Sequence, residues 1–154
     1  MSGGQDAPGW AAIDDALARL YPRQVPHQFA SKTAYEVDTA NPLPAIAVYE
    51  GVRPTHWHYV TYGLSELFEK SSADPDVSGF GFELTMRVPR GADEEQPPTW
   101  PLRALQGLGR YVLANGRGFD TGHCAELGGS IAPGIESLLT CMAFVADPLL
   151  RKIA

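Results

Sequence analysis

The run of residues 79–88 constrains the fold of this chain more than any other stretch. Its apolar residues alternate strictly with glycine and polar residues. Successive side chains of an extended strand point to opposite faces of a sheet, so this period of two predicts a strand with one buried face. We expect five side chains on that face: Phe80, Phe82, Leu84, Met86 and Val88.

Two helices and three further strands are predicted around this run. Apolar residues at helical spacing predict a helix over 10–20 that Pro22 ends. A second helix is expected to begin after Thr99, as its N-cap, and to end near Gly116. Strands are expected over 29–35, 45–49 and 57–62, and a helical turn over 64–68. The 57–62 strand should pair antiparallel with 79–88.

Two features of the remaining sequence complete this expectation. Residues 137–145 are apolar on both faces, as a central strand would be. Gly107 and Gly109 each weaken the second helix, so we expect them where it packs closely against the sheet. The predicted fold is α+β: a mainly antiparallel or mixed sheet with helices packed against it.

Length and composition indicate one globular domain. We expect a disordered leader over residues 1–9 and a single domain over 10–154. The net charge of −6 argues against nucleic acid as a partner, and acidic loops over 74–76 and 93–95 could attract a basic one. No apolar run is long enough to span a membrane and no secretory signal is evident, so we expect a cytoplasmic protein with two reduced cysteines.

Enzyme and metal chemistry receive little support from the sequence. His56 and His58 would share one face of a strand and are weak candidates for a metal site, with a third ligand from His123, Cys124 or Cys141. A metal-dependent enzyme or sensor is therefore the alternative function. Three potential nucleophiles lack a base-and-orienter pattern: Ser65, Cys124 and Ser137. We predict no catalytic residue and no cofactor, and we interpret Glu83 as a polar-face residue paired with Arg87 or a neighbouring strand.

Five blocks of the sequence, in order, resemble the Suppressor of fused family: Trp10–Pro22, His56–Ser65, Ser78–Thr85, Pro97–Pro101 and Leu105–Val112. The resemblance implies a non-enzymatic protein-binding domain matching the family's N-terminal lobe. Animal members clasp a peptide of a transcription factor between two lobes. Bacterial members consist largely of this lobe and are thought to include immunity proteins against polymorphic toxins. A bacterial-type immunity protein with a toxin domain as its partner is the finer hypothesis.

The partner-binding residues we predict are Tyr62, Tyr111 and His123. A tyrosine hydroxyl is best kept at the rim of a groove, which favours Tyr62 and Tyr111 among the aromatic residues. The resemblance matches Tyr111 to a groove tyrosine of animal members, and His123 stands where those members have an aspartate.

The resemblance also implies that the family continues with further strands beyond the end of this chain. We therefore expect an open sheet edge, available to self-association or to addition of a partner strand. A truncated remnant without activity of its own is a third hypothesis, which poor cooperativity of thermal unfolding would favour.

Overall fold

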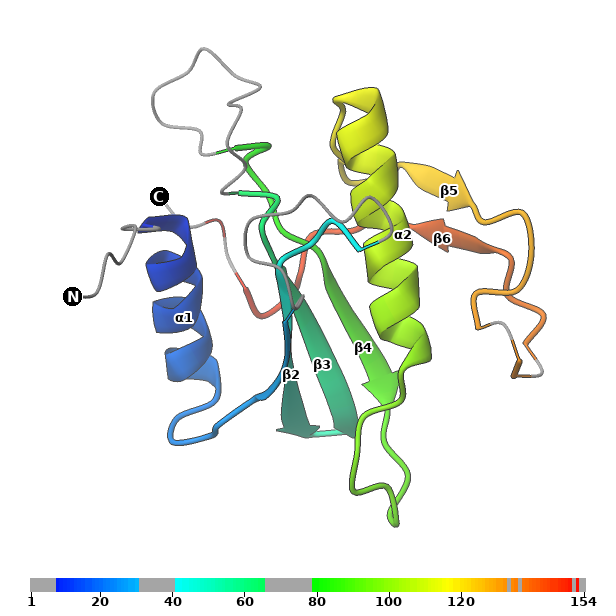
Figure 1. The fold of residues 1–154 in the computed structure, drawn as a ribbon. Helices are drawn as coiled ribbons and strands as arrows, with labels where there is room; N and C mark the ends of the chain where they lie inside the picture. Colours follow the sequence, from blue (N-terminus) through cyan, green and yellow to red (C-terminus); the bar gives the residue numbers. More distant parts are fainter. Residues whose placement is uncertain are drawn as a thin grey trace.

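A four-stranded antiparallel sheet lies between two helices, and a small hairpin projects beside the second helix (Figure 1). The computed structural model describes residues 8–30, 41–65, 79–132, 134–135, 137–150 and 152. In chain order the elements are α1 (Pro8–Leu20), β1 (His27–Ala30), β2 (Ala45–Val52), β3 (Thr55–Tyr62), β4 (Thr85–Pro89), α2 (Trp100–Asn115), β5 (Cys124–Glu126) and β6 (Cys141–Ala143). Strand order in the sheet is β1-β2-β3-β4, and β5 pairs with β6 alone. The α+β prediction is confirmed.

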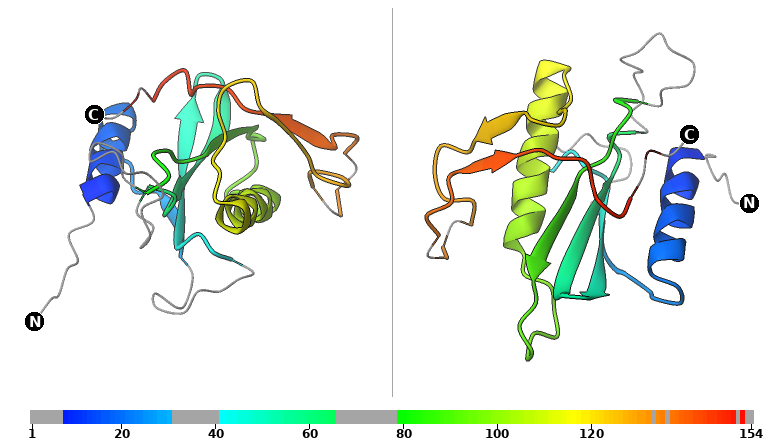
Figure 2. Two further views of the ribbon diagram at one scale, coloured as in Figure 1. Left: turned by 90° about the horizontal axis from the view of Figure 1, so that it is seen from above. Right: turned by 180° about the vertical axis from the view of Figure 1, so that it is seen from behind.

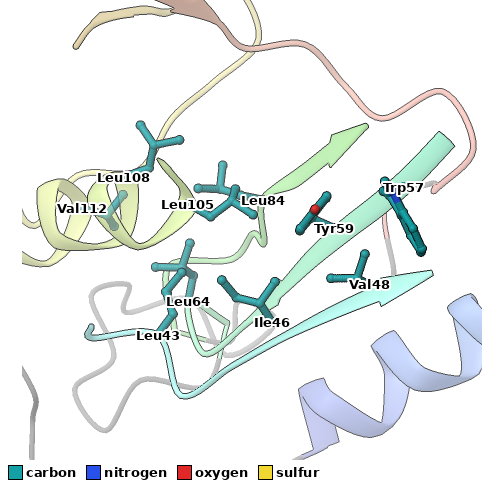
Figure 3. Packing of buried hydrophobic residues seen from close by; sticks show 10 residues of the cluster. All are labelled: Leu43, Ile46, Val48, Trp57, Tyr59, Leu64, Leu84, Leu105, Leu108 and Val112. Atoms are coloured by element: carbon teal, nitrogen blue, oxygen red, sulfur yellow. The ribbon is translucent and has the colours of Figure 1, made fainter. Parts of the chain in front are cut away.

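The larger core fills the space between the sheet and α2 (Figure 3). Strand alternation sends Trp57 and Tyr59 of β3 to this side, where both are fully buried. The cluster consists of Leu43, Ile46, Val48, Trp57, Tyr59, Leu64, Leu84, Leu105, Leu108 and Val112. It combines side chains from the sheet and one face of α2, so α2 is fixed against the sheet by apolar burial.

A second core lies on the opposite face, under α1. Ile13, Leu17 and Tyr21 pack there against the intervening residues of β2 and β3. Trp10 meets the Tyr62 ring edge-on, with ring centroids 5.6 Å apart. The predicted apolar face of the first helix is thus confirmed, although the helix begins at Pro8, two residues inside the predicted leader. Residues 1–7 lie outside the described part of the chain.

The run over 79–88 is only half strand. All five alternating apolar side chains pack on the α2 core as predicted, and β4 pairs antiparallel with β3. However, β4 begins at Thr85, because Gly79 and Gly81 adopt positive φ angles of 55° and 77° that an extended strand excludes. The alternation therefore identified the buried face correctly and the start of the strand incorrectly.

The predicted central strand over 137–145 is wrong. Only Cys141–Ala143 forms a strand, and it pairs with β5 outside the main sheet. Leu138 is 98% exposed and Val145 is 77% exposed, while Met142 and Phe144 pack, partly buried, against the α2 core, so the run is not buried on both faces. An apolar run alone cannot distinguish a buried strand from an exposed one.

Other boundaries moved by a few residues. β2 continues through Val52, past the predicted end at residue 49, and β1 begins at His27. The remainder of the strand expected over 29–35 and most of the turn over 64–68 lie outside the described residues. α2 ends as predicted, with Gly116 in the left-handed region at φ 63°. Thr99 precedes the helix, but its side chain makes no capping hydrogen bond.

The two glycines of α2 have different roles. A β-carbon on Gly109 would lie 2.8 Å from Leu43 Cγ, so this glycine permits the close packing that we predicted, against the segment before β2. A β-carbon on Gly107 would meet only the Arg110 guanidinium, at 3.5 Å, so the same prediction is wrong for Gly107.

These two positions make a matched pair for a stability measurement. We expect Gly107→Ala to raise the free energy of unfolding by about 0.5–1 kcal/mol, because alanine has the higher helix propensity and finds room there. Gly109→Ala should lower it by about 1–3 kcal/mol through overpacking against Leu43. Urea unfolding of both variants checks this, and equal shifts for both would contradict the assignment.

The segment after β6 crosses from the hairpin towards α1 (Figure 2). Asp147 fixes this crossing to the sheet. Its carboxylate accepts two hydrogen bonds from the Arg87 guanidinium, at 2.7 and 3.0 Å, and one from the Thr85 hydroxyl at 2.6 Å. It also accepts the backbone amides of Leu149 and Leu150. The hairpin is therefore tied to the sheet at its C-terminal end.

Candidate functional site

An open groove of about 560 Å³ runs between α2 and β5. Its α2 wall includes Arg103, Gly107 and Tyr111, and the side chain missing at Gly107 leaves space in that wall. Its opposite wall contains the consecutive residues 124–127. Consecutive strand residues point to opposite faces, so a groove that contacts all four follows the edge of the strand.

That edge of β5 has backbone groups available for pairing. Phe144 donates its amide to the His123 carbonyl and Leu127 donates its amide to the Thr140 carbonyl, so residues 123, 125 and 127 direct their backbone groups towards β6. In an antiparallel pair the intervening residues direct theirs the other way. The N–H and C=O groups of Cys124 and Glu126 therefore face away from β6, and no described strand pairs with them.

An aromatic stack contributes Tyr111 and Phe119 to the groove lining. Tyr111 is 54% exposed and stacks on Phe119 with ring centroids 5.5 Å apart, and Phe119 stacks on Phe144 at 4.0 Å. Of the predicted partner-binding residues, Tyr111 lines the groove. His123 is exposed immediately before β5, where its Nδ1 accepts the Asp120 amide at 3.1 Å, and it lies outside the groove lining.

Tyr62 does not reach this groove. It is only 6% exposed and belongs to the core under α1, on the other face of the sheet. Its hydroxyl donates to Asp14 Oδ1 at 2.7 Å, and burial, followed by this hydrogen bond, raises the pKa of Tyr62 well above its ordinary value. The expectation that its hydroxyl lies at a rim is wrong, because a carboxylate on α1 satisfies that hydroxyl inside the protein.

The two candidate metal ligands have protein partners. His58 is fully buried, its Nδ1 lies 2.7 Å from the Tyr21 hydroxyl, and its Nε2 lies 3.6 Å from Asp147 Oδ2. His56 Nδ1 contacts the Pro54 carbonyl at 2.6 Å. Among the residues that the structure describes, no three His, Cys, Asp or Glu side chains are grouped as a metal site requires. Burial lowers the pKa of His58, which keeps it neutral at neutral pH.

Glu83 was predicted to pair with Arg87 or with a neighbouring strand, and it pairs with the neighbouring strand β3 through Thr61. Its Oε1 accepts the amides of Gly63 and Ser65 and the Ser65 hydroxyl, and its Oε2 accepts the Thr61 hydroxyl. Arg87 instead binds Asp147. Burial raises the pKa of Glu83, and the four hydrogen bonds oppose that effect. The carboxylate holds the turn after β3 against the residues that lead into β4.

The remaining candidates take part in local structure. Glu94, from a predicted acidic loop, accepts the Trp57 indole N–H at 3.0 Å, and Ser137 Oγ accepts the Leu139 amide at 3.2 Å. Cys124 and Cys141 are both free thiols. Within the described part of the chain, no helix has the length and apolarity that a bilayer crossing requires.

The sheet, two helices and projecting hairpin define an α+β domain with a groove along an edge of β5 that pairs with no described strand. A family model described as Suppressor of fused protein (SUFU) matches residues 40–154. The chain therefore belongs to the Suppressor of fused family, which at family level is a protein-binding and not an enzymatic family.

Comparisons with individual proteins agree with this family assignment. The human and mouse Suppressor of fused homologs are each 34% identical over 157 residues, which cover 94% of this chain and 32% of theirs. The chain thus spans about a third of the length of these relatives. A crystal structure of the Sufu-Fu complex matches with a TM-score of 0.78 at 33% identity, covering 92% of this chain and 68% of that one. Drosophila Suppressor of Fused matches with a TM-score of 0.77 at 32% identity, covering 93% of this chain and 38% of that one.

Sequence reasoning missed two features of this candidate site. The groove edge depends on β5, for which no strand was predicted, and on β6, which lies within the predicted central strand. Arg103 and Gly107 line the groove, but their positions on α2 acquire meaning only once β5 lies opposite. A sequence signal did exist: a glycine inside a helix, where it costs about 1 kcal/mol, often marks a packing or functional constraint.

Proposed function

We propose that this chain is a non-enzymatic, cytoplasmic protein-binding domain that takes an extended segment of its partner into the groove between α2 and β5. The observation that carries the proposal is the outward-facing backbone of Cys124 and Glu126 along the groove. An extended peptide can add to such an edge through main-chain hydrogen bonds, with side-chain pockets supplying specificity. One of the matched structures is a complex of Sufu with Fu, which agrees with a protein partner.

The finer proposal is that the partner is a toxin domain and that this chain neutralises it. Support comes from the resemblance to bacterial members, and the test is co-expression with the product of a neighbouring gene. Growth rescue and co-purification as a defined complex are expected. Self-association through the same β5 edge is the competing outcome, and concentration-dependent light scattering of the purified chain would reveal it.

The groove itself is tested with peptides selected from a random display library on the purified chain. We expect selected peptides to lose at least about tenfold in affinity on Gly107→Leu, because the new side chain fills the groove. Glu126→Pro should weaken them similarly, since it removes an outward N–H while leaving the β6 pairing intact. Glu126→Ala is the matched control and should retain binding. Fluorescence anisotropy measures the affinities.

Unfolding curves show whether a variant loses peptide binding only because it no longer folds. Gly107→Leu and Glu126→Pro should unfold cooperatively with midpoints close to that of the parent chain. Selected peptides that bind Gly107→Leu and the parent equally would show that binding occurs elsewhere. A library that yields no binders would count against recognition of extended peptides by this chain.

A further inference from the structure

Charge is distributed unevenly along this acidic chain. Residues 96–119, which include all of α2, contain three of the twelve basic residues and none of the eighteen acidic ones. The three are Arg103, Arg110 and Arg117. This stretch is therefore basic, although the chain as a whole has a net charge of −6.

Two of these arginines lie on the groove. Arg103 and Arg110 are seven residues apart, which places them two turns apart on the same side of α2, at a rise of about 10 Å. Both are exposed and both line the groove, one on each side of Gly107. Glu126 is the one carboxylate among the described lining residues, so arginine outnumbers acid at this site.

The rest of the lining is largely apolar. Leu108 is buried, while Phe119 and Ile131 are partly buried. A peptide added to the β5 edge would present alternate side chains to opposite faces. One set would meet this apolar lining, and the other set would lie at the rim that carries the arginines.

We infer that the groove selects an extended acidic segment in which carboxylates alternate with apolar side chains. This inference rests on the proposed function and specifies the chemistry of the partner. Guanidinium groups bind carboxylates through charge-assisted, often bidentate hydrogen bonds, so Arg103 and Arg110 supply the selectivity. The backbone of Cys124 and Glu126 would supply affinity without regard to sequence.

The overall negative charge does not cancel this preference at physiological salt. The Debye length is then about 8 Å, so acidic residues farther away are largely screened, while groups in contact with the peptide are screened much less. At low salt the distant charges should weaken binding of an acidic peptide. A groove preference should therefore be measured at about 0.15 M salt.

Three synthetic peptides of about ten residues test the inference, with valine alternating with glutamate, serine or lysine. Fluorescence anisotropy with the full chain should show the glutamate peptide binding about three- to tenfold more tightly than the serine peptide, and the lysine peptide more weakly than both. The double variant Arg103→Gln/Arg110→Gln should abolish this order. The control Arg19→Gln/Arg23→Gln removes the same charge on the α1 side and should preserve it, and Glu126→Gln should strengthen binding of the glutamate peptide.

The outcomes separate this inference from the proposed function. Equal binding of the three peptides, with loss on Gly107→Leu, would overturn the acidic preference and leave the groove as a peptide site. An order that persists in Arg103→Gln/Arg110→Gln would also overturn it. Failure of all three peptides to bind would overturn both the preference and strand addition at this groove.

Discussion

Replacing Glu83 by alanine is expected to lower the free energy of unfolding by about 3–5 kcal/mol, because it leaves several buried donors without an acceptor. The carboxylate accepts four hydrogen bonds, from Thr61, Gly63 and Ser65. The Thr61 oxygen in turn accepts the Leu84 amide at 2.9 Å. One side chain thus connects the end of β3 to the start of β4, and its loss should loosen both.

A graded series identifies the cause. Glu83→Gln keeps the shape and one acceptor oxygen, so its loss should be about 1–3 kcal/mol. Glu126→Ala, which removes an exposed carboxylate, should stay within about 0.5 kcal/mol of the parent. Urea unfolding at neutral pH measures all three. If Glu83→Ala proved no worse than Glu126→Ala, the hydrogen-bond network would not be a source of stability.

The second large effect is expected at Asp147. Asp147→Ala should lower the free energy of unfolding by about 2–4 kcal/mol, because the Arg87 guanidinium, 25% exposed, loses a bidentate partner that is itself 9% exposed. The crossing segment also loses its anchor at Leu149 and Leu150. Asp93→Ala, in an exposed turn, is the control and should have little effect. Faster amide exchange in β6 of the Asp147 variant would confirm that the hairpin has been released.

The contact between His58 and Asp147 predicts that acid lowers the stability of the protein in two steps. Burial lowers the pKa of His58, so the unfolded chain takes up this proton near its ordinary pKa of about 6.5 and the folded chain only at lower pH. The contribution of His58 to stability is therefore fully present above about pH 6.5. Below that pH the free energy of unfolding falls by up to about 1.4 kcal/mol per pH unit.

Asp147 should act in a lower window. Burial alone would raise its pKa, but the nearby His58 and the hydrogen bonds from Arg87, Thr85 and the Leu149 amide outweigh burial and hold the pKa well below its usual range. Its contribution is present above about pH 4 and is lost as the pH falls further. Unfolding of the parent chain and of His58→Gln between about pH 7.5 and 5 checks the upper window. If the free energy of unfolding changed with pH in the same way in the parent chain and in His58→Gln, the assignment to His58 would be contradicted.

Local sequence patterns correctly predicted the buried faces of the helices and of the residues around β4, and the end of α2. The helical spacing around Leu17 and Val112 and the alternation from Phe80 to Val88 each fixed which side chains face a core, because one buried face imposes one period. Gly116 marked the end of α2 because glycine readily adopts its left-handed conformation. The family resemblance came from the same stretches, and it correctly implied the fold.

Long-range pairings were beyond that reasoning. His58 of β3 contacts Asp147 of the segment after β6, and the local sequence around one residue gives no sign of its contact with the other. Tyr62 was misjudged because its acceptor, Asp14, lies 48 residues earlier in the chain. For Glu83, alternation left Arg87 and the neighbouring strand as equal candidates, because it gives the face of a side chain and not the groups that the side chain can reach; the structure shows the strand, through Thr61.

The sequence by itself determined the α+β class, the buried faces of both helices and the family, since periodicity and short motifs are local properties of the chain. Only the tertiary structure decided where the proposed binding groove lies. The groove exists because β5 comes to lie opposite α2, which places Arg103, Gly107 and Arg110 along a strand edge that begins more than ten residues later in the sequence. That placement depends on the packing of the α2 core and on the Asp147 anchor, and both are contacts between residues distant along the chain.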